Sequence, residues 1–92
     1  MKIFSSYTVR PGCVAEAAKR FLEGKATLPT GVTLLGRWHK TDGTGGYSVL
    51  ETDSPATVYE FSISWTDVLE IHDHLVIEDA EVGPALAKVF GK

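Results

Sequence analysis

One stretch decides the fold: Val32-Thr-Leu-Leu-Gly-Arg-Trp-His-Lys40, then Thr41-Asp-Gly-Thr-Gly-Gly46, then Tyr47-Ser-Val-Leu-Glu-Thr52. Successive strand side chains point to opposite faces of a sheet, and the first part alternates in this way. The middle part is rich in residues that tolerate positive φ and reverse the chain. We therefore expect a β-hairpin. Its first strand should place Val32, Leu34, Gly36 and Trp38 on one face and Thr33, Leu35, Arg37 and His39 on the other.

The composition predicts a folded domain and excludes several classes of protein. The chain has 92 residues, 43% of them hydrophobic, and a formal net charge of −3, so we expect one domain over residues 1–92. An acidic balance weighs against nucleic-acid binding, which usually needs a basic face. The sequence contains neither a bilayer-spanning stretch nor a secretory signal pattern. The single cysteine, Cys13, excludes an internal disulfide and favours a cytoplasmic location.

Further elements are expected on both sides of the hairpin. Residues Lys2–Arg10 alternate as a strand, and the helix expected over Cys13–Glu23 has apolar residues at helical spacing. After the hairpin, Asp53 or Ser54 can cap a helix that begins at Pro55. A strand over Glu70–Glu78 and a helix over Asp79–Phe90 follow. The buried stripe of the helix after Pro55 is expected to contain Val58, Phe61, Ser62, Trp65 and Leu69.

This order of elements predicts an α+β fold class. The arrangement β-α-β-β-α-β with a C-terminal helix is ferredoxin-like, with a four-stranded antiparallel sheet. Two helices cover one face of the sheet, while the other face still carries apolar and aromatic side chains. A large exposed apolar surface usually marks a site of association, and two sheets that meet face to face would bury it. We therefore expect a homodimer.

Several motifs occur in a fixed order along the chain. They are Pro29-x-Gly31-Val32-x-Leu34-Leu35-Gly36-Arg37-Trp38-His39, then Asp42-Gly43-x-Gly45-Gly46-Tyr47, then Glu51-Thr52-Asp53-x-Pro55-Ala56, then Trp65-x-Asp67-x-Leu69. From about Lys2 to Asp79 the chain resembles the DUF3303 family of small bacterial proteins. The resemblance implies a dimeric α+β barrel and no particular chemistry. Family members tend to read Phe-Glu-Val-x-Pro-Val where this chain has Ile71-His-Asp-His-Leu-Val76, so its histidines there are peculiar to it.

The hairpin carries the densest polar chemistry. Arg37 and His39 are expected on one strand face, Glu51 lies on the paired strand, and Tyr7 is expected to line the same cavity. Such a cluster in a cleft can bind a ligand or carry out acid–base chemistry, so these four residues are the candidate ligand-binding set. The alternative is structural, with an ion pair between Arg37 and Glu51 that fixes the hairpin or a dimer interface.

His72 and His74 form a secondary candidate set, because residues two apart on a strand share a face. Together with His39 and a carboxylate they would supply the ligands of a metal site. No cysteine or second carboxylate completes a recognised spacing. We therefore expect solvent-exposed or interface histidines, with no metal and no cofactor.

The tryptophans are expected to pack internally. Trp65 falls on the stripe of its helix and belongs to the predicted core. Trp38 is expected under a helix, on the face of Val32 and Leu34. Cys13 has no histidine or basic pair beside it in the sequence, so we expect no role for its thiol.

The sequence leaves the function open between three classes. The chain contains no phosphate-binding loop and no hydrolase or zinc-protease pattern. The first interpretation is a homodimer that binds an unknown small molecule in a cavity. The second, from the resemblance, is an enzyme like the cofactor-free monooxygenases and isomerases of the dimeric α+β barrels. The third is a purely structural interaction module.

Overall fold

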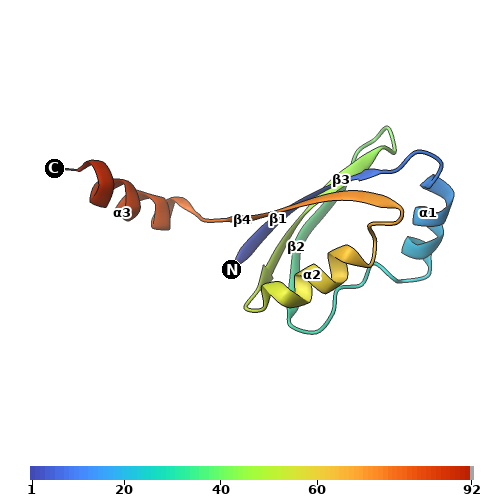
Figure 1. Cartoon of the computed structure of the whole chain (residues 1–92), viewed down its shortest axis with the longest axis horizontal. Coiled ribbons are helices and arrows are strands. Elements are labelled where there is room, and N and C mark those ends of the chain that lie inside the picture. Colours follow the sequence, from blue (N-terminus) through green and yellow to red (C-terminus); the bar gives the residue numbers. More distant parts are fainter. Residues whose placement is uncertain (92) are drawn as a thin grey trace.

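A computed structural model describes residues 1–91. Its four strands form one antiparallel sheet in the order β2-β3-β1-β4 (Figure 1). This arrangement confirms the predicted ferredoxin-like α+β fold. The elements are β1 (Lys2–Val9), α1 (Val14–Leu22), β2 (Val32–His39), β3 (Gly45–Thr52), α2 (Pro55–Ile63), β4 (Leu69–Val76) and α3 (Asp79–Phe90).

Helix α2 begins as predicted and ends earlier than predicted. Ser54 is its N-cap residue and a proline follows in the first turn. Trp65 lies in the turn after the helix, and Leu69 already belongs to β4. The hydroxyls of Ser64 and Thr66 donate hydrogen bonds to backbone carbonyls three residues upstream. Such side-chain bonds compete with the helical pattern, which explains the early end.

The hydrophobic core is small. Trp65, which is 7% exposed, is part of it, so the prediction of its burial is confirmed. Ile3, Leu50 and Val58 form one buried cluster between the sheet and α2. The buried apolar side chains of residues 1–91 are Ile3, Leu50, Val58, Trp65 and Val68. A core this thin leaves room between the sheet and the helices.

The pairing of β2 with β3 contains a β-bulge. Leu34 lies opposite Leu50, whereas Gly36 lies opposite Val49. Leu35 is therefore an extra residue on β2, without a partner of its own. A bulge of this kind shifts the alternation of side chains by one position, so the uninterrupted alternation expected from the sequence is wrong beyond Leu34.

The bulge decides which side chains of β2 face the helices. Arg37 and His39 share the helix-covered face, because cross-strand partners lie on the same side. Trp38 lies opposite Tyr47 on the other face and is 58% exposed. The prediction that Trp38 packs under a helix is therefore wrong. Its ring lies over Gly36, where an added Cβ would clash with ring atoms.

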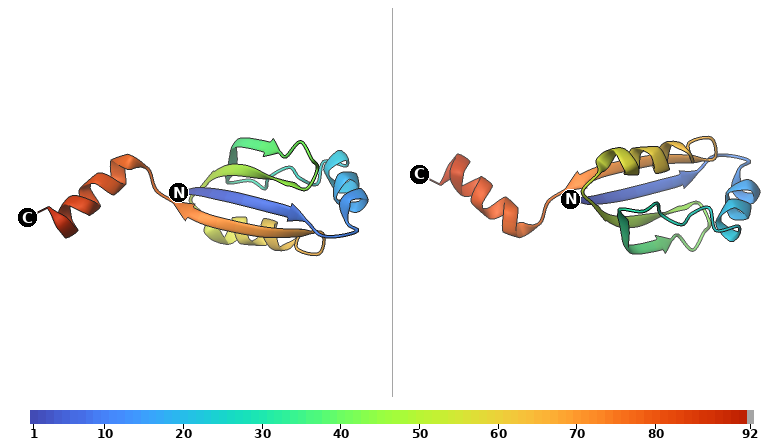
Figure 2. Two further views of the ribbon diagram at one scale, coloured as in Figure 1. Left: turned by 90° about the horizontal axis from the view of Figure 1, so that it is seen from above. Right: turned by 90° about the horizontal axis from the view of Figure 1, so that it is seen from below.

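The second face of the sheet, which we call the open face, carries aromatic side chains. The rings of Phe4 and Tyr47 are 5.9 Å apart, and Trp38 pairs with Tyr47 across the strands. His72 and His74 extend this face onto β4. Among residues 1–91 no helix lies across this surface, since α1 and α2 border the opposite one (Figure 2).

Helix α3 stands away from the rest of the molecule, at the end opposite α1 (Figures 1 and 2). The molecule consequently measures 55 × 29 × 19 Å. Leu86, Val89 and Phe90 of α3 are exposed, and Phe90 is 77% accessible. Within the described chain, the helices are too short or too polar to cross a bilayer.

Candidate functional site

A cavity of about 460 Å³ lies between the helix-covered face of the sheet and helices α1 and α2. Its wall is mostly apolar and includes Phe21 of α1, which is itself partly exposed to solvent. The size falls within the range of small-molecule sites, roughly 300–1,000 Å³. Its apolar lining residues include Val14, Phe21, Phe61, Trp65, Leu69 and Ile71.

Tyr7 and His39 form a polar pair at one end of the cavity. The phenolic oxygen lies 2.8 Å from His39 Nδ1, and Phe21 packs edge-on against the imidazole at 5.4 Å between ring centres. Burial raises the pKa of the Tyr7 phenol, and the charge of Arg37 offsets only part of this rise. The phenol is therefore neutral at neutral pH and donates to Nδ1 whenever that nitrogen is unprotonated.

Arg37 brings a positive charge to the same end of the cavity. Its Nη2 donates to the backbone carbonyl of Ala26 at 3.0 Å, and its guanidinium lies 6.0 Å from the ring centre of Phe21. The side chain is partly buried and lines the cavity. The β-bulge is responsible for this position, because regular pairing of Leu35 with Val49 would place Arg37 opposite Tyr47 on the open face.

A polar row crosses the sheet beneath the helices. Arg37 on β2 pairs with Ser48 on β3, Ser48 with Ser5 on β1, and Ser5 with Asp73 on β4. Asp73 accepts a hydrogen bond from Ser62 of α2. The two serines at the centre of the row are buried, and both line the cavity. Small hydroxyls here, in place of large apolar side chains, leave the cavity floor open.

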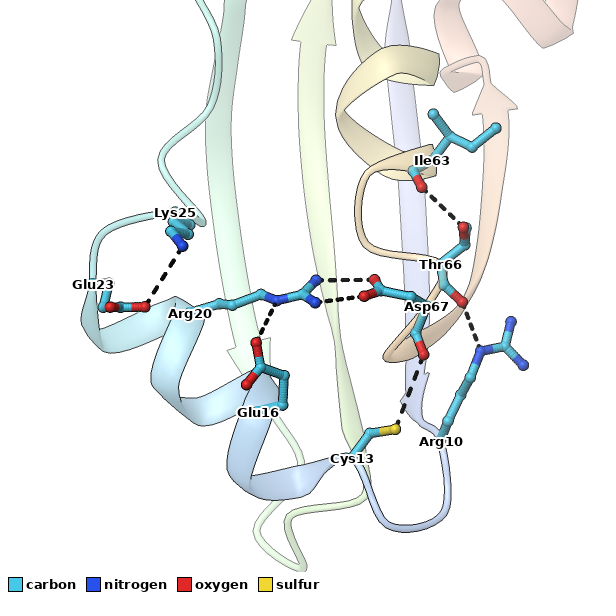
Figure 3. A network of polar contacts seen from close by, with 9 residues as sticks. All are labelled: Arg10, Cys13, Glu16, Arg20, Glu23, Lys25, Ile63, Thr66 and Asp67. Carbon is cyan, nitrogen blue, oxygen red and sulfur yellow. Dashed lines mark hydrogen bonds and ion pairs between the residues drawn. The ribbon is translucent and has the colours of Figure 1, made fainter.

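A polar network fixes the position of α1 (Figure 3). The Arg20 guanidinium binds both carboxylate oxygens of Asp67, one at 2.9 Å, and also contacts Glu16. It lies 5.6 Å from the ring centre of Trp65. The hydrogen bonds from Arg20 hold the pKa of the Asp67 carboxyl below its usual value. They connect α1 to the α2–β4 turn and so maintain one wall of the cavity.

The structure brings three of the four predicted site residues together and separates the fourth. Tyr7, Arg37 and His39 line one end of the cavity. Glu51 lies on the open face, where its carboxylate pairs with the Met1 ammonium at 3.0 Å. The expected ion pair between Arg37 and Glu51 is therefore not formed. Residues 37 and 51 lie on opposite sides of the sheet because the bulge lies between them.

His72 and His74 lie on the open face, opposite Ser6 and Phe4 of β1. His39 lies on the other face and on a different edge strand, so the three imidazoles do not converge. Within residues 1–91, no group of three or more potential metal ligands comes together. The nearest carboxylate to His72 is that of Glu70, 3.6 Å away on the same strand.

Sequence reasoning missed Ser5, Ser48 and Phe21 as cavity residues. One signal was present for the serines, because each interrupts the apolar residues on the inward side of its strand. Phe21 was assigned to the apolar stripe of its helix, and that assignment holds. Its contact with His39 depends on the angle between α1 and the sheet, which spacing along the chain does not encode.

Residues 1–90 match the family model described as "Domain of unknown function (DUF3303)". The chain belongs to the DUF3303 family. The match covers the whole cavity wall and all but the last residue of the described chain. No curated protein matches the sequence. Family membership thus agrees with the resemblance seen in the motifs, and assigns no activity to the cavity.

Proposed function

We propose that this DUF3303 protein is a homodimer that binds a small molecule in the cavity between sheet and helices. The carrying observation is the cavity itself, with a mostly apolar wall and three polar side chains, Tyr7, Arg37 and His39, at one end. Sites for small molecules typically combine an apolar wall with a few convergent polar groups. The single cysteine, which is unpaired in the structure, supports a cytoplasmic location.

The open face supports the dimer. Phe4, Trp38 and Tyr47 present partly exposed rings side by side on it. Monomeric proteins rarely expose a contiguous aromatic surface of this kind. A second copy offers the same surface, and two sheets packed face to face bury both.

Helix α3 also supports association. Isolated helices shorter than about 12–15 residues are marginal in water, and α3 has 12 residues with Pro84 inside it. Its apolar residues Leu86, Val89 and Phe90 are exposed. A surface of a second chain would provide the packing that the helix lacks in a single copy.

Catalysis is the second candidate function, and the Tyr7–His39 pair favours it. When Nδ1 of His39 donates to the phenol oxygen, Nε2 carries the lone pair. That nitrogen can then accept a proton from a bound molecule, as in general base catalysis. The family of reactions would be that of the cofactor-free monooxygenases or isomerases. Turnover of a bound molecule that is lost in His39→Gln, with binding retained, would distinguish an enzyme from a binding protein.

Native mass spectrometry of protein isolated from its source host tests the proposal. We expect a dimer of twice the 10.0 kDa chain mass that carries an additional non-covalent mass. Protein that has been unfolded, dialysed and refolded is the control and should give the dimer alone. A monomer at all micromolar concentrations would contradict the dimer. A dimer whose cavity takes up no small molecule would favour a purely structural module.

A further inference from the structure

The ionisable side chains among the described lining residues include no carboxylate. The chain as a whole is acidic, with a formal net charge of −3. Yet the cavity wall contains Arg37, His39 and Lys40 and, among the described residues, no aspartate or glutamate. The ammonium of Lys40 lies 5.7 Å from the ring centre of Tyr47, a residue of the open face. Arg37 is therefore the permanent positive charge that the cavity offers to a ligand.

Arg37 has hydrogen-bonding capacity to spare. A guanidinium has five N–H donors, and within residues 1–91 the one hydrogen bond found for this side chain goes to the carbonyl of Ala26. No carboxylate of the described chain lies within 4.0 Å of it. Arg20 shows the contrast, because both Asp67 and Glu16 neutralise it. A partly buried arginine without a carboxylate is suited to a ligand that supplies one.

Hydroxyl groups continue this end of the cavity. Ser48 lies beside Arg37 in the sheet, and Ser5 lies beside Ser48. Neither serine hydroxyl has a hydrogen-bond partner among residues 1–91, and neither is a fully buried unsatisfied atom, so both are accessible from the cavity that they line. The phenol of Tyr7 lies on the same face, two positions further along β1. The serine hydroxyls can donate to the oxygens of an acid once Arg37 has bound it, and the phenol can do so when Nδ1 of His39 donates to the phenol oxygen.

The rest of the cavity is suited to the body of the ligand. Phe61 and Trp65 reach it from α2 and the following turn, and Leu69 and Ile71 from β4. These side chains offer no charge and prefer contact with carbon over contact with water. A polar or doubly charged molecule would bring no apolar group to pack against these side chains.

We propose that the ligand is a monoanionic organic acid with an apolar body, whose carboxylate binds Arg37 and the neighbouring hydroxyls. This inference rests on the proposed function, since it names the chemical class that the same cavity takes. A cation would meet no carboxylate among the described lining residues, and the carboxylate of Asp73 beside them already accepts a hydrogen bond from Ser62. A neutral apolar molecule would leave the guanidinium without an anionic partner.

Octanoate and 1-octanol test this inference as a matched pair, because they share the alkyl chain and differ in the head group. Trp65 lines the cavity, and in Trp38→Phe it is the remaining tryptophan of two. Titration of this variant, followed by tryptophan fluorescence, reports binding beside Trp65. We expect octanoate to bind tighter than 1-octanol by about 10- to 100-fold, the usual range for hydrogen bonds to a charged group.

The variant Arg37→Gln should reverse the order of the two compounds, because an unpaired carboxylate is costly to bury. Arg10→Gln is the matched control. It also removes an arginine that donates to a backbone carbonyl, that of Thr66 at 2.8 Å, but Arg10 does not line the cavity. Its affinities should equal those of the parent. Arg37→Lys keeps the charge and should retain the octanoate preference if Arg37→Gln proves too unstable to measure.

The outcomes separate the two proposals. Tighter binding of 1-octanol than of octanoate by the parent variant Trp38→Phe would overturn the anionic ligand. An octanoate affinity that neither Arg37→Gln nor Arg10→Gln changes would overturn it too. Both results would leave the binding function standing. Absence of binding by both compounds in a folded protein would overturn the binding function as well.

Discussion

The two faces of one sheet differ in every property that matters for function. On the helix-covered face, buried Ile3 and Leu50 are followed along their strands by the serines of the polar row, and Tyr7 comes next on β1. The cavity floor therefore changes from apolar to polar along the strands. On the open face, Phe4 and Tyr47 lie next to each other and partly exposed. Strand alternation alone separates these two sets. The comparison shows how one short sheet provides both a cavity floor and an exposed aromatic surface, which is the interface of the proposed dimer.

Truncation of the core tryptophan is expected to have the largest effect. Trp65→Ala should lower the free energy of unfolding by ~3–5 kcal/mol, the usual cost of removing a buried aromatic side chain. Urea denaturation at one fixed chain concentration measures it. Tyr59→Ala removes a 64% exposed ring from α2 and should cost less than ~1 kcal/mol. Equal losses in the two variants would show that the helix-covered face is not a core.

A charge on the open face should act on association. Tyr47→Glu would bury an unpaired carboxylate in the proposed dimer interface, and we expect the dimer to weaken by at least ~2 kcal/mol, about 30-fold. Light scattering over a dilution series measures the dissociation constant. Tyr59→Glu places the same charge on the outer side of α2 and should leave the dimer intact. If the two variants dissociate alike, or neither does, association uses another surface.

Two glycines allow a comparison at smaller scale. A Cβ at Gly46 would meet the backbone carbonyl of Trp38 and the phenol of Tyr7, whereas one at Gly36 would meet only the Trp38 ring. Gly46→Ala should therefore cost ~1–3 kcal/mol, as overpacking usually does. Gly36→Ala should cost less than ~1 kcal/mol, because an exposed ring can move aside, and should change the Trp38 emission. Thermal melts and fluorescence spectra of both variants test this prediction. A larger loss of stability in Gly36→Ala than in Gly46→Ala would contradict it.

The smallest expected effect concerns acid. The Asp67 pKa is lowered in the folded state, first by hydrogen bonds from Arg20. Stability from this pair is therefore complete above the ordinary value of 3.8 and is lost as the pH falls through the lower folded-state value. The Tm of the wild type should exceed that of Asp67→Asn at pH 6, and this difference should become smaller as the pH is lowered to 2. Asp53→Asn, at an exposed carboxylate without an ion pair in residues 1–91, should give no such trend.

Much of the fold was predictable, since it depends on local patterns. The spacing of apolar residues predicted α1 to within a residue at either end, and Pro55 marked the start of α2. Trp65 was rightly assigned to the core. These features follow from periodicity and capping, which any window of the sequence displays.

The face of each side chain on β2 was only partly predictable. Between Val32 and His39 the adjacent Leu34 and Leu35 break the polar–apolar alternation, but this break alone does not show that Leu35 lacks a partner on β3. The bulge results from the pairing with β3, a tertiary constraint. For the same reason Trp38 and Glu51 lie where sequence reasoning did not expect them, while Arg37 and His39 remained together because both follow the bulge.

The bulge also affects how the protein tolerates changes in chain length. Leu35 is 51% exposed and has no partner on β3, so its deletion straightens β2 and keeps Arg37 and His39 on the cavity side. Strand β3 has no such unpaired residue, because it pairs with neighbouring strands on both sides. Loss of Val49 there would turn either Ser48 or Leu50 away from the helices. A shortened β2 is therefore compatible with a working cavity, whereas β3 must keep its length.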